Sequence, residues 1–132
     1  MSTTDVPTFH AAITGVDFVC VPTADFDRAT AFYGEVLELR ESARWGSMPA
    51  AEFETGSLTL AVMQSDAFGQ EFRPNSLPIA LRVTDIAAAR ARLEARGVEF
   101  SAAFDSGSCH QAVFHDADGN PLVLHQRYAP TS

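Results

Sequence analysis

The chain has 132 residues, of which 46% are hydrophobic and 20% charged, a composition typical of one folded globular domain. Its formal net charge is −8, with nine positively charged residues that are all arginine, which argues against nucleic acid or an anionic membrane as a partner. Two cysteines without metal or redox spacing, no export signal and no apolar run of about 18 residues predict a cytoplasmic protein.

The first half of the chain predicts one helix among four strands. Apolar residues alternate up to Val21 and then recur at helical spacing from Phe26 to Val36, with Asp25 at the N-cap position. The expected elements are an arm at 1–13, strands at 15–21, 39–45, 50–54 and 57–64, a helix at 26–36 and a connector at 65–76.

The second half repeats this order. Asp85 is expected to cap a helix that ends before Gly97, and Asp116–Pro121 is typical of a hairpin turn. The expected elements are strands at 78–83, 98–103, 109–115 and 122–127 and a helix at 86–96.

The two halves also align in sequence. With Asp25 placed over Asp85, FVCVPTADFDRATAFY and PIALRVTDIAAARARL align without a gap, and GSLTLAVM has its counterpart in GNPLVLHQ. The sequence therefore predicts an α+β fold in which residues 14–128 form one domain. Two βαβββ modules, at 14–64 and 77–128, are joined by the connector at 65–76.

These stretches, with FHDADGNPLVLHQRY near the end, resemble the vicinal oxygen chelate superfamily of glyoxalases, bleomycin-resistance proteins and extradiol dioxygenases. The resemblance runs from about Gly15 to Arg127. It implies that the two modules curve into a half-open barrel whose inner face is the binding or active cleft. It also implies a homodimer, in which the cleft lies within one chain or between two.

In metal-dependent members of that superfamily, the ligands are His, Glu or Gln on the first and last strands of each module. The resemblance assigns these positions to Phe18, Thr59, Pro78 and Val123. A catalytic metal needs about three imidazole, carboxylate or thiolate ligands, which these residues do not supply. No metal site and no other cofactor are predicted, although a divalent metal in a non-standard site stays open.

Strand alternation indicates which side chains face the cleft. Residues on the opposite face from the helix-packed set should point inward. The predicted ligand-binding set is mainly apolar with a few polar groups: Phe18, Cys20, Trp45, Thr59, Ala80, Arg82, Gln111, Val113, Val123 and His125. A pocket of this character suits a small aromatic or hydrophobic molecule.

Three of these residues allow more than one interpretation. His125 is the candidate general acid or base, or else a histidine at the rim of the cleft. Trp45 is either a stacking lid or an aromatic in a module or dimer contact. Arg82 binds an anionic group of the ligand or forms a structural ion pair.

Two functions compete. The first is a metal-independent binding protein of the bleomycin-resistance kind, which binds a small hydrophobic or aromatic compound without a reaction. The second is an enzyme, namely a lyase, isomerase or dioxygenase, which either uses His125 without metal or has a non-standard metal site. A regulatory or accessory domain is a third interpretation, for which the sequence offers no positive feature.

Overall fold

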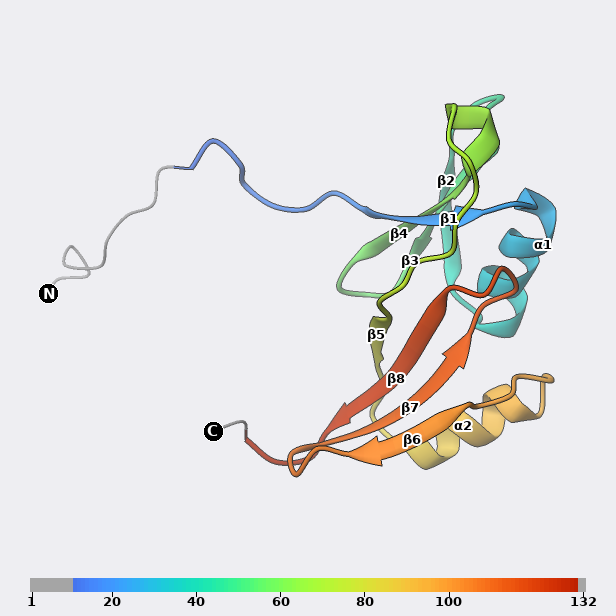
Figure 1. Ribbon diagram of the computed structural model, residues 1–132. Coiled ribbons are helices and arrows are strands. Elements are labelled where there is room, and N and C mark those ends of the chain that lie inside the picture. The colour runs from blue at the N-terminus through green and yellow to red at the C-terminus, as the bar shows by residue number, and fades with distance from the viewer. Residues whose placement is uncertain (1–10, 131–132) are drawn as a thin grey trace, which may run out of the picture.

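The computed structural model describes residues 11–130, so most of the predicted arm at 1–13 lies outside the described residues. Residues 11–13 form neither helix nor strand. Figure 1 shows residues 11–18 running away from the rest of the molecule.

The first module has the predicted order of one strand, one helical segment and three strands. Its elements are β1 (Val19–Thr23), α1 (Phe26–Ala31) continued by a π-helical segment at Phe32–Val36, β2 (Arg40–Arg44), β3 (Ala50–Glu54) and β4 (Thr59–Gln64). They form a sheet in the order β1-β4-β3-β2, in which only β1 and β4 are parallel. The predicted connector contains a short 3-10 helix, Ser65–Phe68, which the sequence analysis did not anticipate.

The second module repeats the topology. Its elements are β5 (Ile79–Arg82), α2 (Ile86–Glu94), β6 (Ala102–Asp105), β7 (Cys109–His115) and β8 (Pro121–Arg127). They form a sheet in the order β5-β8-β7-β6, with β5 and β8 parallel. The α+β fold of two βαβββ modules is therefore confirmed.

The strand expected at 98–103 is displaced toward the C-terminus. Val98 and Phe100 pack against the hydrophobic core before any pairing begins, and β6 pairs with β7 only from Ala102 onward. Apolar residues in a connector that covers the core resemble a strand in sequence. The sequence pattern therefore placed the strand too early.

Both helices begin in the same way. The carboxylate of Asp25 accepts from the backbone N–H of Arg28 at 3.1 Å, and the carboxylate of Asp85 accepts from that of Ala88 at 3.0 Å. These bonds satisfy backbone donors that have no partner within the helix, so both predicted caps are confirmed.

A glutamine at the end of the last strand of each module completes the cap. The Gln64 side chain accepts from the N–H of Phe26 at 3.0 Å, and that of Gln126 accepts from the N–H of Ile86 at 2.8 Å. The last strand thereby holds the start of the helix in both copies. This is why the repeat extends to the strand ends.

The hydrophobic core lies on the helix side of both sheets. Figure 1 shows α1 and α2 on the same side of the molecule, while the opposite faces of the sheets carry no helix. The buried core combines side chains of both modules: Val21, Ala29, Tyr33, Ala51, Phe53, Leu60, Val62, Leu93, Ala112, Phe114, Leu122 and Leu124. The two sheets are separate and leave a half-open, curved arrangement, as the sequence analysis expected.

Candidate functional site

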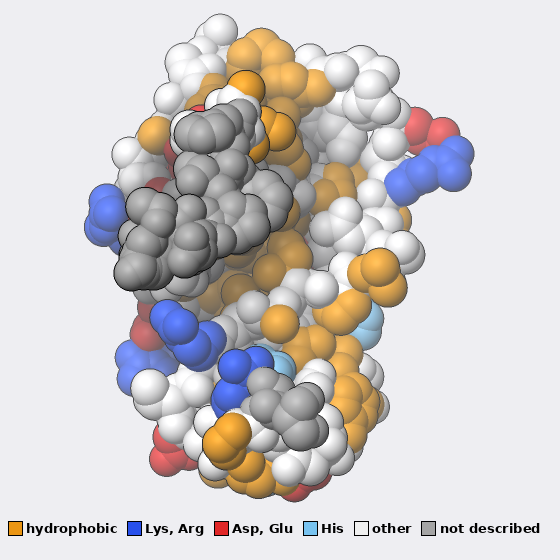
Figure 2. Space-filling model, turned by 90° about the vertical axis from the view of Figure 1, so that its left-hand side faces the viewer, with side chains coloured by type: hydrophobic (Ala, Val, Ile, Leu, Met, Phe, Trp, Pro, Cys, Tyr) orange, Lys and Arg blue, Asp and Glu red, His pale blue; other side chains and the backbone are white. Residues whose placement is uncertain are grey.

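The helix-free faces of the two sheets carry the residues that alternation assigned to the cleft. Val19 and Val21 pack toward the core, so Phe18 and Cys20 lie on the other face of β1, where both are exposed. Figure 2 views the molecule from its helix-free side and shows hydrophobic side chains along a hollow in the middle of this face. This hollow is the candidate site.

An aromatic group marks the part of the site in the first module. The rings of Phe18 and Trp45 meet edge to face with centroids 5.3 Å apart, and Phe68 lies 6.1 Å from Trp45 on another side. Such pairs favour edge contacts because the ring edge is positive and the face negative. Phe18 nevertheless keeps 37% of its surface exposed, so the group presents apolar area to solvent.

Two glutamates that the sequence analysis missed lie on the same face. Glu52 accepts from the indole N–H of Trp45 at 2.7 Å and pairs in register with Ala61, the neighbour of Cys20. Glu54 accepts from the hydroxyls of Ser42 and Thr59, which hold the pKa of its carboxyl below the usual value. Glu52 and Glu54 alternate along β3 with the core residues Ala51 and Phe53. This alternation in the sequence could have assigned both glutamates to the open face.

The second module contributes two rows of side chains across β5, β8 and β7. Register pairing places Ala80 beside Val123, which pairs with Val113. The neighbouring row places Arg82 beside His125, which pairs with Gln111. These pairings follow from the parallel β5–β8 and antiparallel β7–β8 registers.

Burial differs along these rows. Val123 is buried, His125 is half-buried, and Arg82 is exposed with no ion pair to a residue in 11–130. The guanidinium of Arg82 and the imidazole of His125 are therefore accessible beside the buried, apolar Val123. The arrangement can bind an organic molecule through its apolar area and give it a few hydrogen bonds.

The structure thus brings the predicted residues together in two sets. Phe18, Cys20, Trp45 and Thr59 belong to the first module, whereas Ala80, Arg82, Gln111, Val113, Val123 and His125 belong to the second. Within residues 11–130, no hydrogen bond or ring contact joins one set to the other. Each sheet offers its own half of the site.

The residues that the sequence resemblance assigns to the family's four metal positions do not fit a metal. Phe18, Pro78 and Val123 have no donor atom, and the hydroxyl of Thr59 donates to Glu54 at 2.7 Å. In the described part of the chain, no three His, Cys, Asp or Glu side chains are grouped so as to hold a metal ion. A divalent ion prefers several imidazole, carboxylate or thiolate ligands.

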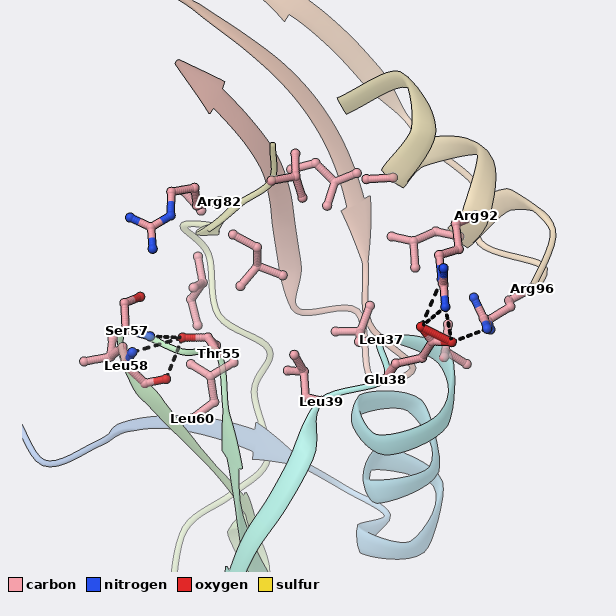
Figure 3. A pocket seen from close by; sticks show the side chains of 18 residues that line it. Leu37, Glu38, Leu39, Thr55, Ser57, Leu58, Leu60, Arg82, Arg92 and Arg96 are labelled. Carbon is pink, nitrogen blue, oxygen red and sulfur yellow. Dashed lines mark hydrogen bonds and ion pairs between the residues drawn. The ribbon is translucent and has the colours of Figure 1, made fainter. Parts of the chain in front are cut away.

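A separate cavity of about 390 Å³ lies on the helix side, between the start of β2, the β3–β4 turn, β5 and α2. Only two of the predicted site residues, Ala80 and Arg82, border it. Figure 3 shows the guanidinium of Arg82 directed away from the leucines of this cavity. The cavity is therefore distinct from the hollow on the helix-free face.

A sequence model of the Glyoxalase/Bleomycin resistance protein/Dioxygenase superfamily matches residues 15–124. The chain belongs to this superfamily. A search of curated proteins gave no match. None of the described helices is long and apolar enough to cross a membrane.

Several solved structures share the fold. TnmS3, described as an antibiotic binding protein from Streptomyces sp. CB03234, is 29% identical with a TM-score of 0.76, covering 90% of this chain and 100% of that one. A putative glyoxalase family protein from Bacillus anthracis is 20% identical with a TM-score of 0.77, covering 91% and 100%. The fosfomycin resistance protein FosX from Listeria monocytogenes is 20% identical with a TM-score of 0.70, covering 88% and 95%.

Proposed function

We propose that the protein binds a small hydrophobic or aromatic molecule in the hollow on its helix-free face, without the metal of the superfamily's metal-dependent members. The partly exposed Phe18–Trp45 pair carries this proposal, because aromatic rings on an open sheet face offer a stacking surface. The similarity to TnmS3, an antibiotic binding protein, supports the same class of function.

The polar groups indicate what else the molecule carries. Glu52 and Glu54 lie beside the aromatic group, and Arg82, His125 and Gln111 lie on the other sheet. A ligand that spans both sets would have an apolar ring system, a hydrogen-bond donor at one end and an acceptor or negative group at the other. The cytoplasmic location expected from the sequence stays a prediction.

The proposal includes a homodimer. β1 and β5 are edge strands, and within residues 11–130 each is hydrogen-bonded to a strand on one side only. A second copy facing the helix-free side would cover the hollow and close the site. Sedimentation at several protein concentrations tests this, and a monomer at every concentration contradicts it.

Binding is testable through Trp45, the only tryptophan of the chain. Planar aromatic compounds should change its fluorescence, and calorimetry gives their affinity. Phe18→Ala should weaken binding about tenfold, since an aromatic contact and its buried area contribute about 1–2 kcal/mol. Tyr128→Ala is the matched control, because Tyr128 is an exposed aromatic that stacks on His110 instead. Equal losses in the two variants would place binding elsewhere.

Metal content tests the proposed metal independence. Elemental analysis of the purified protein should find less than one zinc, nickel, iron or manganese per chain. Binding of the aromatic compound should also survive treatment with a chelator. Stoichiometric metal that a chelator removes together with binding would overturn metal independence.

Metal-free catalysis is the second candidate. It is favoured by the half-buried His125, which lies in register between Arg82 and Gln111. Under this alternative His125→Ala abolishes turnover of a bound compound while binding persists. Absence of turnover in the wild-type protein supports binding alone.

A further inference from the structure

The cavity on the helix side of the molecule shares only Ala80 and Arg82 with the residues of the proposed function. Its volume of about 390 Å³ falls within the range of about 300–1,000 Å³ typical of small-molecule sites. It is lined by leucines from both modules, namely Leu37, Leu39, Leu58, Leu60, Leu81, Leu93 and Leu124. Figure 3 shows leucines along the cavity, with charged and hydroxyl side chains at its sides.

An ion cluster closes one side of this cavity. The carboxylate of Glu38 accepts two hydrogen bonds from Arg92, at 2.9 and 3.0 Å, and a third from Arg96. Glu38 also has a φ of 59°, in the left-handed region that a residue with a side chain seldom adopts. Glu38 follows the C-cap residue Leu37, a position at which helices commonly end with a left-handed residue, and its carboxylate meets Arg92 of α2 and Arg96 just after α2.

The cluster has more donors than acceptors. A guanidinium has five N–H donors, and Arg96 uses its Nη2 on Glu38. Its other N–H groups have no hydrogen-bond partner within residues 11–130. Two arginines against one glutamate leave a local charge of about +1 in a protein whose net charge is −8. An anion is the group that complements this excess.

We propose that this cavity is a second binding site, for an amphipathic carboxylate whose apolar part lies among the leucines and whose carboxylate is bound by Arg96 and Arg92. Planar carboxylates match the guanidinium fork, and an alkyl chain or a single ring matches the leucine lining. The ligand class is a medium-chain fatty acid or a monocyclic aromatic acid.

Octanoate is the probe, with 1-octanol as its uncharged counterpart. Calorimetry of the full chain should show octanoate binding at least tenfold more tightly than 1-octanol. In methyl and indole NMR spectra, octanoate should shift the signals of Leu39 and Leu93 and leave the Trp45 indole unchanged. This location readout needs no variant and separates the cavity from the hollow of the proposed function.

Substitutions test the arginine contact. Arg96→Gln should weaken octanoate binding about tenfold or more and leave 1-octanol unaffected, because the charge-assisted hydrogen bonds are lost. Arg73→Gln is the matched control, since Arg73 pairs with Glu71 in the exposed connector. Three results overturn the proposal: no octanoate binding, equal affinity for the alcohol, or equal affinity in Arg96→Gln. Loss of aromatic-compound binding in Phe18→Ala with octanoate binding intact would show that the two sites are independent.

Discussion

The two modules share their local construction and differ in what they present. In each, an aspartate and a glutamine satisfy the first backbone donors of the helix, and the first strand pairs in parallel with the last. The helix-free face of the first module carries aromatic rings and glutamates, whereas that of the second carries arginine, histidine and glutamine. Backbone hydrogen bonding preserves the fold in both copies, while the open face is free to diverge.

The hairpin turns before the last strands differ even more. In the first module Thr55 closes the turn by donating to the carbonyl of Leu58 and accepting from its N–H. In the second, the buried Asp116 accepts from the backbone of Asp118 and Asn120 and from the Asn120 side chain. It also accepts from the hydroxyl of Tyr33, at 2.6 Å, in the first module. One turn is local, and the other joins the modules.

Removing the joining carboxylate should have the largest effect. Asp116→Ala leaves four donors without their acceptor, of which the Tyr33 hydroxyl is fully buried. We expect a loss of about 3 kcal/mol in the free energy of unfolding, measured with urea. Thr55→Ala, in the corresponding turn of the first module, should cost about 1 kcal/mol. Equal costs would contradict the difference between the turns.

The contact between the modules should also depend on pH. Burial, followed by the charge of Asp116 and its hydrogen bond, raises the pKa of Tyr33 far above its usual value. Below the unfolded pKa of about 10 both states keep the proton, so the contribution of Tyr33 is complete. Above that pH the unfolded chain releases the proton while the folded protein retains it, so stability falls.

Tyr33→Phe tests this directly. The variant should be about 1–2 kcal/mol less stable at pH 7, because Asp116 loses a buried donor. From pH 9 to 11.5 its stability should decline less steeply than that of the wild type. If the unfolding free energies of the two proteins fall equally with pH across this range, Tyr33 is not the cause of the decline. Tyr128, whose pKa is raised by its hydrogen bond to Asp105, is present in both proteins and does not distinguish them.

The helix N-caps should contribute equally to stability in the two modules. Asp25→Ala and Asp85→Ala each remove one carboxylate acceptor, and each should cost about 1 kcal/mol in chemical unfolding. The two values should agree within about 0.5 kcal/mol. If the substitution leaves stability unchanged in one module alone, the glutamine is sufficient to hold the start of the helix in that module.

The smallest change in stability is expected in the connector between the modules. Arg73 and Glu71 pair at 3.1 Å with side chains that are 81% and 78% exposed. Solvent screens such a pair, so Arg73→Ala should change the unfolding free energy by less than about 0.5 kcal/mol. A larger change would mean that the connector takes part in holding the modules together.

Local sequence was sufficient for the elements and for their faces. Alternation placed Val21 in the core and Cys20 on the open face, and the acidic caps located both helices. Both signals depend on residues only a few positions apart, where the strand period and the helix start act directly. Two strands are exceptions. The first was predicted at 15–21 but β1 spans Val19–Thr23, and β6 begins late because the apolar residues before it pack against the core.

Tertiary structure decided the contacts between distant segments. The hydroxyl of Tyr33 donates to Asp116, and Glu38 accepts from Arg92 and Arg96. No periodicity encodes these pairs, because they depend on how two separately paired sheets pack through one shared core. The repeat in the sequence therefore determined two similar modules, and only their packing created the cavity and the joining turn between them.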